Sequence, residues 1–352
     1  MNNKEINIPS LLKIGNGKTA KIGKYLIDRN FTEIALFFSD GIENIVSEKL
    51  YSGLEKYNIK IVHKDNISDI NIENAIHTAF KIPSTTKVLL GIGGGKALDY
   101  GKYCAHILKL PYITVPTSVS NDGFCSPNTS LLVDGKRKSV KSTIPYGVVA
   151  DIEIITTAPK SSLYSGIGDT ISKITALWDW KQSFLKGLEY FNDFAGLMAH
   201  NSLDIVYLCN NLKPEDNEFK YRMVNSLVLS GIAMEIAGSS RPASGSEHLI
   251  SHALDAVLTN QKMHGLQVGI ATYLCSLLQN NQQDKVKEFL LKTGFFNFVA
   301  QNPINKKEFI KALKLAPTIK QNYYTILSEK DSFEKAVKFI DTDEILNQII
   351  KD

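Results

Sequence analysis

Three of the seven histidines in this 352-residue chain fall in one short stretch, at His248, His252 and His264. His248 and His252 are four residues apart in a segment with helical periodicity, so they share one face of the expected helix. His264 follows a short polar linker and begins the next apolar helical segment. A helix and the start of its antiparallel neighbour can direct His248 and His264 at one point, and two imidazoles suit zinc or a similar metal. The stretch predicts a metal site, with hydrogen-bonded core histidines as the alternative.

A carboxylate would complete an open site with three protein ligands. Asp169 is the candidate, because in SGIGDTISK its charged side chain interrupts an otherwise apolar and glycine-rich helix start. The alternative for Asp169 is an acid that caps this helix or stabilises its first turn through the helix dipole. The spacing leaves both interpretations open.

A glycine cluster in GIGGGKALDYGK, residues 91–102, follows an expected strand and opens an expected helix. Glycines at such a turn let backbone N–H groups approach a pyrophosphate, and the helix N-terminus favours its negative charge. The stretch is neither a Walker A loop nor GxGxxG, because Leu90, Lys96 and Ala97 stand at positions that those motifs reserve for other residues. It predicts a dinucleotide loop, with a strand–helix turn that binds nothing as the alternative.

Two other strand ends carry polar residues. Asp40 ends an early apolar strand, where an acid can bond an adenine ribose and favour NAD over NADP. A helix N-cap is the alternative for Asp40. The stretch VPTSVSNDGFCSP, residues 115–127, follows a later strand and contains Asp122 among small polar side chains. Loops at the carboxyl ends of parallel strands bind ligands in α/β proteins, and a solvated loop is the alternative.

The first half of the chain alternates between strand and helix patterns, which predicts a parallel sheet with helices on both faces. Strands are expected at 33–40, 58–63, 87–95 and 111–118, helices at 41–57, 69–80 and 96–109, and a β-hairpin at 129–143 about Asp134-Gly135. After residue 160 only helical periodicity remains. We therefore expect two domains: an α/β domain over 1–157 that binds a dinucleotide, and an all-helical domain over 158–352 that binds metal and substrate. A cleft between them is the expected place for the ligands.

The composition narrows the class of protein. Hydrophobic residues make up 43% and charged residues 22% of the chain, as in ordinary globular proteins. Only four of the 40 basic residues are arginine and no basic block occurs, so we expect no nucleic-acid partner and instead a small anionic substrate. The sequence has no CxxC pair, no signal-peptide core and no apolar run of bilayer length, which favours a cytoplasmic protein without a membrane partner.

Five stretches together resemble the superfamily of iron-containing alcohol dehydrogenases and dehydroquinate synthases, and within it the branch of the sn-glycerol-1-phosphate dehydrogenases. They are GIGGGKALDYGK, VPTSVSNDGFCSP, SGIGDTISK, SSRPASGSEHLISHALD and HGLQVG, which run in the family's order over about residues 85–270. The resemblance implies a Rossmann-like N-terminal domain, a helical C-terminal domain and a homodimer. Iron-dependent members carry a further histidine one turn after the metal-binding acid. This chain has Lys173 there, which resembles the zinc branch.

The resemblance also implies roles for individual residues. The metal, Zn²⁺ or alternatively Ni²⁺, would be bound by Asp169, His248 and His264. His252 would contact substrate and relay a proton, and Asp122 would contact substrate beside the nicotinamide. NAD or NADP would be held by the loop and strand-end residues Gly93, Gly94, Gly95, Lys96, Asp99, Thr117, Ser118 and Ser126.

The implied reaction is the reduction of dihydroxyacetone phosphate to sn-glycerol 1-phosphate with NADH or NADPH. The substrate phosphate needs a cation, for which Arg241 and Lys173 are candidates; a bond to a helix C-terminal carbonyl is the alternative for Arg241. Three other functions compete: another polyol or sugar-phosphate dehydrogenase, a lyase of the dehydroquinate synthase kind, and a nucleotide-binding protein without catalysis.

Overall fold

The computed structural model describes residues 6–352, which form two compact units that divide after Pro159. The division lies two residues beyond the boundary expected from the sequence. The first unit is built on a sheet of six strands in the order β1-β8-β5-β4-β2-β3, with every pairing parallel. The strands are β1 Leu11–Gly15, β2 Glu33–Ser39, β3 Lys60–Ile67, β4 Val88–Gly93, β5 Tyr112–Pro116 and β8 Gly147–Asp151.

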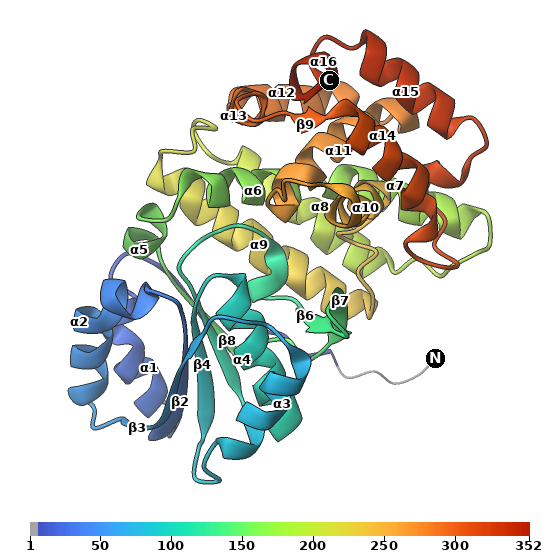
Figure 1. Cartoon of the computed structure of the whole chain (residues 1–352). Coiled ribbons are helices and arrows are strands. Elements are labelled where there is room, and N and C mark those ends of the chain that lie inside the picture. The colour runs from blue at the N-terminus through green and yellow to red at the C-terminus, as the bar shows by residue number, and fades with distance from the viewer. Residues whose placement is uncertain (1–5) are drawn as a thin grey trace. The chain divides into compact units, whose positions relative to one another are not determined.

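Helices cover both faces of this sheet, as the strand–helix alternation predicted (Figure 1). Side chains of α1 and α2 join the apolar cluster on one face, and side chains of α3 and α4 join the cluster on the other. The helices are α1 Ile22–Ile27, α2 Ile42–Glu55, α3 Ile72–Lys81, α4 Gly95–Leu108 and α5 Ile152–Thr156, with the short 3₁₀ turns η1 Thr19–Lys21 and η2 Asp122–Phe124. The α/β fold class expected from the sequence is confirmed.

The connections of β2 and β4 create the point where a ligand is expected. These two strands are neighbours, yet α2 follows β2 onto one face and α4 follows β4 onto the other. In doubly wound sheets the carboxyl ends at such a reversal leave a crevice that binds ligands. Ser39 and Asp40 follow β2 there, and the glycine cluster follows β4.

Two edge features complete the first unit. The hairpin strands β6 Asn128–Val133 and β7 Lys136–Lys141 meet at Asp134 and Gly135, whose φ angles of 53° and 70° fit the turn that this pair predicts. The strands β1 and β8 were absent from the sequence expectation. Each has only five residues, and their pairing is stabilised by Asp151, whose carboxylate accepts bonds from the backbone of Gly17 at 3.1 Å and Thr19 at 2.9 Å.

The second unit is largely helical. Its helices are α6 Lys160–Ile171, α7 Lys173–Leu185, α8 Asp193–Tyr207, α9 Asn217–Ala237, α10 Ser246–Val257, α11 His264–Gln279, α12 Gln283–Lys292, α13 Phe295–Ala300, α14 Lys306–Leu315, α15 Ser332–Thr342 and α16 Leu346–Ile349, with 3₁₀ turns η3 Ala316–Thr318 and η4 Ile326–Ser328. The expectation of an all-helical domain needs one correction, because β9 Ile304–Asn305 and β10 Ile350–Lys351 pair in parallel. Each of these two strands has only two residues, which is too short for the alternation of polar and apolar residues that marks a strand in a sequence. Within residues 6–352 no helix is long and apolar enough to cross a membrane.

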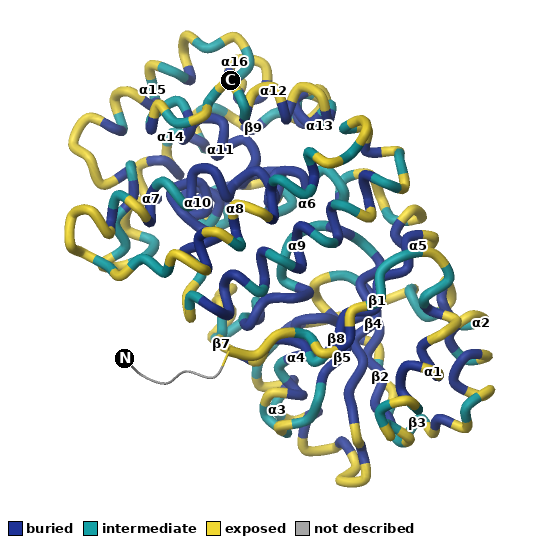
Figure 2. The backbone as a smooth tube through the Cα atoms, turned by 180° about the vertical axis from the view of Figure 1, so that it is seen from behind, coloured by how far each residue is buried: buried dark blue, intermediate teal, exposed yellow. Residues whose placement is uncertain are grey.

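The helices α10 and α11 form much of the buried centre of this unit (Figure 2). Helix α11 approaches α6 closely at glycines: a Cβ at Gly168 would lie 1.9 Å from the carbonyl oxygen of Gly265 and 3.0 Å from the Cα of Gly269. Gly168 precedes Asp169, and Gly265 follows His264. The backbone contact therefore fixes how close these two polar side chains come.

Replacing Gly168 with Ala is predicted to destabilise the protein. Ala raises helix propensity by up to about 1 kcal/mol over Gly. The backbone oxygen of Gly265 cannot rotate away from the new methyl group, so overpacking dominates and the net loss is about 1–3 kcal/mol. Urea unfolding without ligands measures it. The matched control is Gly95→Ala, since a Cβ at Gly95 meets nothing within 4 Å. Equal stability of Gly168→Ala and the wild-type chain would contradict the glycine contact.

Candidate metal centre and cofactor loop

Three donors from separate segments meet in the second unit. Asp169 lies near the end of α6, His248 in the first turn of α10, and His264 at the first position of α11. One ligand atom of each lies within 4.8 Å of those of the other two. The Nε2 atom of His248 is 3.7 Å from Oδ1 of Asp169, and the rings of His248 and His264 are 5.0 Å apart. Such a group can bind one divalent cation after small side-chain adjustments.

Asp169 does not begin its helix, so the alternative of a first-turn acid is wrong. Helix α6 starts at Lys160, and Asp169 is 1% exposed in its last turn. Burial by itself would raise the pKa of this carboxyl, but the Lys173 ammonium and His248 outweigh burial and hold the pKa below its usual range. Lys173 Nζ is 3.5 Å from Oδ2 of Asp169 and donates to its backbone oxygen at 2.6 Å. The buried carboxylate is therefore anionic and can serve as a donor to a cation.

His248 is oriented by its neighbour Glu247, which the sequence analysis did not single out. The Nδ1 atom of His248 is 2.8 Å from Oε1 of Glu247. Glu247 is fully buried, and its other oxygen accepts the Thr175 hydroxyl at 2.7 Å. A carboxylate accepts the Nδ1 proton, which leaves the Nε2 lone pair directed toward Asp169. Carboxylate–histidine pairs of this kind orient metal-bound imidazoles. In the sequence, the acid directly before His248 in GSEHLISHA could have indicated this role of Glu247.

His264 is oriented in the same way by a hydroxyl. The Ser251 hydroxyl donates to Gln267 Oε1 at 2.7 Å and lies 3.1 Å from Nδ1 of His264. Because the hydroxyl proton goes to Gln267, Ser251 is left to accept from Nδ1–H, and Nε2 of His264 is the unprotonated nitrogen. Both imidazoles thus present Nε2 as the donor. The carboxylate and two oriented imidazoles fit a zinc-like cation with an open coordination position.

His252 lies beside the three donors without joining them. Its ring is 5.7 Å from that of His264, and its side chain is 40% exposed. The Nδ1 atom is 4.0 Å from a carboxylate oxygen of Asp255 on the same helix. A partly exposed imidazole next to a metal centre can exchange protons with solvent.

Two cations share an aromatic ring near this centre. The Arg241 guanidinium carbon is 3.4 Å and Lys320 Nζ is 4.4 Å from the centroid of Tyr323. Arg241 forms an ion pair with Glu189 and donates to the backbone oxygen of Tyr324, which is a loop carbonyl and not the helix end considered as its alternative. Among the ion pairs of residues 6–352 none involves Lys320. Burial and the neighbouring Arg241 lower the pKa of Lys320 to about 8, whereas Glu247 acts in the opposite direction.

In the first unit, the glycine cluster forms the turn from β4 into α4. Gly93 has a φ of 144°, and a Cβ there would lie 2.2 Å from the Ser39 hydroxyl oxygen, so only glycine fits. That hydroxyl accepts a bond from the backbone N–H of Gly94 at 3.1 Å. Gly95 begins the helix with open space around its Cα, and Lys96 is exposed. The helix N-terminus is thus accessible to a phosphate.

A buried ion pair holds the neighbouring loop. Asp99 lies 3.6 Å from Lys102 Nζ and accepts the backbone N–H of Ser130 at 3.2 Å. Lys102, which the sequence analysis did not single out, donates to the backbone oxygens of Gly123 at 2.6 Å and Ser126 at 3.0 Å. Asp99 therefore contacts Lys102 and the hairpin, and Lys102 contacts the loop. In the sequence, a lysine one turn after an acid in an apolar helix could have indicated this buried ion pair.

The remaining predicted cofactor residues lie at strand ends. Thr117 is buried, and its N–H donates to the backbone oxygen of Gly93 at 3.0 Å. The Ser126 hydroxyl donates to the backbone oxygen of Asn128, the first residue of β6, at 3.1 Å. Asp122 begins η2, and the Ser118 hydroxyl oxygen would be 4.0 Å from a Cβ at Gly94. Asp40 is exposed; Gly41 occupies the N-cap position of α2, so the N-cap interpretation of Asp40 is wrong.

The fold is similar to that of the iron-containing alcohol dehydrogenases. A family model described as iron-containing alcohol dehydrogenase matches residues 13–159. Among solved structures, a glycerol dehydrogenase from Schizosaccharomyces pombe gives a TM-score of 0.76 over 97% of this chain and 91% of that chain, at 19% identity. At that identity the likeness shows the fold.

Curated relatives narrow the class further. A glycerol-1-phosphate dehydrogenase (NAD(P)+) of Metallosphaera sedula is 34% identical over 92% of this chain and 93% of its own length. One of Methanococcoides burtonii is 36% identical over 92% of this chain and 91% of its own. The chain belongs to the family of the glycerol-1-phosphate dehydrogenases. The resemblance seen in the sequence is confirmed, and the similarity does not favour the lyase and other-polyol alternatives.

Replacing Glu247 with Gln is predicted to weaken metal binding by about 10–100-fold, because a neutral amide accepts the Nδ1 proton of His248 less strongly than a carboxylate does. Competition with a chromophoric chelator measures the dissociation constant. The matched control is Glu218→Gln, which makes the same change at a partly exposed position of α9. If Glu247→Gln bound metal as tightly as the control, Glu247 would not orient the ligand.

Proposed function

We propose that this protein reduces dihydroxyacetone phosphate to sn-glycerol 1-phosphate with NADH or NADPH, using a divalent metal. The observation that carries the proposal is the 34% identity, along 92% of the chain, to a protein named glycerol-1-phosphate dehydrogenase. The three oriented donors in the second unit support the metal requirement. The names of these relatives specify NAD(P)+ and glycerol 1-phosphate, a small phosphorylated alcohol.

Asp169, His248 and His264 would hold the cation, and we propose Zn²⁺, with Ni²⁺ as the alternative. One carboxylate and two imidazoles leave a fourth position for substrate, which is the arrangement of catalytic zinc sites. When bound, such a cation polarises a carbonyl oxygen and stabilises the charge that develops on it during reduction. The ligand set also suits other first-row metals, so the identity of the metal needs elemental analysis.

The N-terminus of α4 would bind the cofactor pyrophosphate through the backbone N–H groups at Gly94, Gly95 and Lys96. Asp40 at the end of β2 would bond the adenine ribose and favour NADH, because a carboxylate repels a 2′-phosphate. Thr117, Ser118 and Ser126 would line the cofactor site, and Asp99 would hold its loop. We propose that Asp122 contacts substrate near the nicotinamide.

Lys320 would bind the substrate phosphate. It shares a ring with Arg241, whose charge Glu189 already neutralises, so Lys320 is the cation with charge to spare. Its electrostatic coupling to Glu247, which orients His248, relates it to the metal centre. Contact of Lys173 with phosphate is not supported, because its ammonium is bonded to Asp169.

His252 would deliver the proton that balances the reaction. NAD(P)H supplies a hydride to C2 of the substrate, and one proton must reach the C2 oxygen to give the alcohol. The His252 ring is close to His264 and its side chain is 40% exposed, so it can take a proton from solvent and pass it on.

We also propose a homodimer, from the resemblance, and a cytoplasmic location, from the composition. Light scattering tests the first proposal and cell fractionation tests the second.

The purified protein tests the proposal directly. The zinc-loaded enzyme is expected to oxidise NADH when dihydroxyacetone phosphate is the substrate, and to lose this activity when a chelator is added. Because of Asp40, it should use NADH more efficiently than it uses NADPH. His248→Ala should lose both metal and turnover. Turnover of His248→Ala without bound metal would refute the metal centre, and net NADH consumption only with other substrates would refute the assignment of dihydroxyacetone phosphate.

Lys320→Gln is predicted to raise KM for dihydroxyacetone phosphate by at least about tenfold, since a charge-assisted contact to phosphate is lost. KM for dihydroxyacetone, which has no phosphate, should stay the same. The matched control is Lys307→Gln, an exposed lysine of α14. Equal increases in KM for both substrates would show that Lys320 has a structural role and does not bind phosphate.

A further inference from the structure

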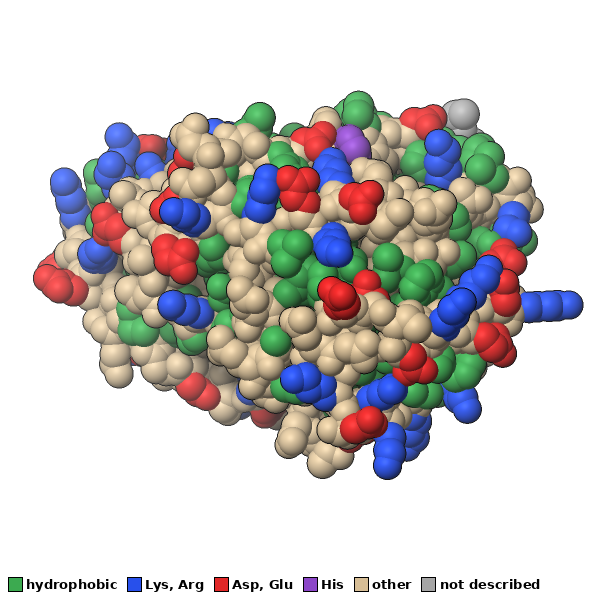
Figure 3. All heavy atoms as spheres, turned by 90° about the horizontal axis from the view of Figure 1, so that it is seen from above, with side chains coloured by type: hydrophobic (Ala, Val, Ile, Leu, Met, Phe, Trp, Pro, Cys, Tyr) green, Lys and Arg blue, Asp and Glu red, His purple; other side chains and the backbone are tan. Residues whose placement is uncertain are grey.

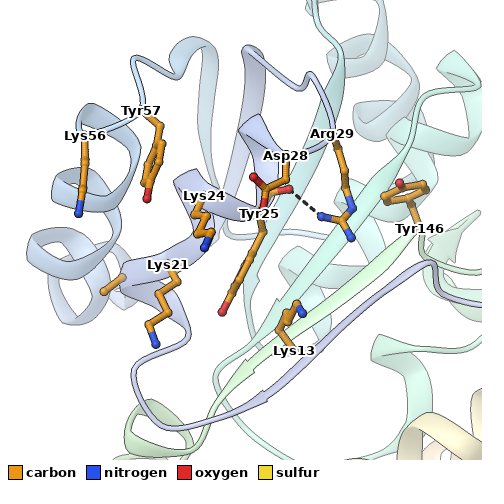
Figure 4. Close-up of a pocket in the computed structure, with 10 residues that line it drawn as sticks. Lys13, Lys21, Lys24, Tyr25, Asp28, Arg29, Lys56, Tyr57 and Tyr146 are labelled. Atoms are coloured by element: carbon orange, nitrogen blue, oxygen red, sulfur yellow. Dashed lines mark hydrogen bonds between the residues drawn. The ribbon is translucent and has the colours of Figure 1, made fainter.

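A pocket of about 790 Å³ lies in the first unit on the face that α1 and α2 cover, and its size is that of a small-ligand site. Figure 4 shows its side chains converging from β1, from η1 and α1 with the turn after them, from the end of α2 and from the approach to β8. The lining residues are Lys13, Ala20, Lys21, Lys24, Tyr25, Asp28, Arg29, Lys56, Tyr57 and Tyr146. The cofactor loop opens α4, which packs on the opposite face of the sheet.

The pocket has a strong surplus of positive charge. Five of its lining residues are basic and one is acidic, a surplus of four, which equals the net charge of the whole chain. The rest of the chain is therefore balanced, with 35 basic and 35 acidic residues. The face drawn in Figure 3 shows such mixing of both signs. Among the ion pairs of residues 6–352 none uses any of the five basic residues of the pocket.

Two of these cations lie in the wall and are held in place. Arg29 is half-buried, and its guanidinium donates to the backbone oxygen of Tyr25 at 3.0 Å, the dashed line of Figure 4. Lys13 is also half-buried, with Nζ 5.5 Å from the ring centroid of Tyr25, which is 8% exposed. The one hydrogen bond of Arg29 leaves its other N–H groups for a ligand. Half-buried cations without counter-charges repel one another, and an anion in the pocket removes that cost.

From this geometry we propose that the pocket binds a small anion with two or more phosphate groups, at a site separate from those of substrate and cofactor. A phosphate monoester carries about −1.5 to −2 charges at neutral pH, so two groups match the surplus of four. The concave shape favours a small molecule over an extended polyanion. The phosphate groups would contact Lys13, Lys21, Lys24 and Arg29. The forked guanidinium of Arg29 suits a pair of phosphate oxygens.

Calorimetric titration of the zinc-loaded full chain, with the cofactor site saturated by NAD+, tests the proposal. The probes are tripolyphosphate, pyrophosphate, ADP and orthophosphate. Two double variants remove the charge, Lys13→Gln with Arg29→Gln in the wall and Lys21→Gln with Lys24→Gln at the exposed rim. The matched control is Lys307→Gln with Lys311→Gln, which removes two exposed charges from α14.

Tripolyphosphate is expected to bind saturably with one site per chain, more tightly than orthophosphate. Each pocket variant should weaken that binding at least about tenfold, and the control should change it less than twofold. ADP that binds more tightly than pyrophosphate, with the same loss in both variants, would support a nucleotide as the ligand. Binding that persists in both pocket variants, or that occurs only on vesicles of anionic lipid, would overturn the proposal. The rim variant keeps the test decisive if the wall variant fails to fold.

Discussion

The contact between α6 and α11 is the constraint on which the candidate site depends. Two helix backbones approach until a Cβ at Gly168 would overlap the carbonyl oxygen of Gly265. This contact lies next to Asp169 and His264, so the separation of the helices sets the distance between two of the three donors. Ordinary side chains would keep the helix axes about 8–10 Å apart. The glycines let the donor atoms of a short aspartate and a histidine approach the same point.

The third donor depends on a buried polar network. Glu247 bonds His248, and it also accepts the N–H of Gly245 at 2.6 Å. Next to it, Asp179 of α7 accepts the backbone N–H groups of Ser246 and Ile326, each at 2.7 Å. Burial and the charge of Glu247 raise the pKa of Asp179 to about 7. Placing two acids together in a buried region is costly, and these bonds offset part of the cost. The network thereby connects the start of α10 to the segment that carries Lys320.

In the first unit, the sheet reversal positions the candidate cofactor loop, and a buried ion pair holds the segments next to it. The reversal between β2 and β4 leaves the carboxyl ends open, and Ser39 and Gly93 then shape the turn into α4. Lys102 holds the following loop by two backbone oxygens while Asp99 holds the hairpin. Burial raises the pKa of Asp99 and lowers that of Lys102, and the charge of each residue opposes the shift of the other. The Asp99–Lys102 pair stabilises the fold through its hydrogen-bond geometry, because buried charges are stabilising only when they are fully bonded.

The sequence by itself determined the α/β order, the hairpin turn, and the candidate donors Asp169, His248 and His264, because local periodicity and residue chemistry are properties of neighbouring residues. It missed β1 and β8, which pair with each other from opposite ends of the first unit, and it placed Asp169 at the start of a helix that begins nine residues earlier. Only the tertiary structure decided which groups orient the donors, and that Lys320 lies beside Arg241 on the ring of Tyr323. Those properties depend on backbone approach and burial between segments far apart in the chain, and a single sequence does not contain those distances.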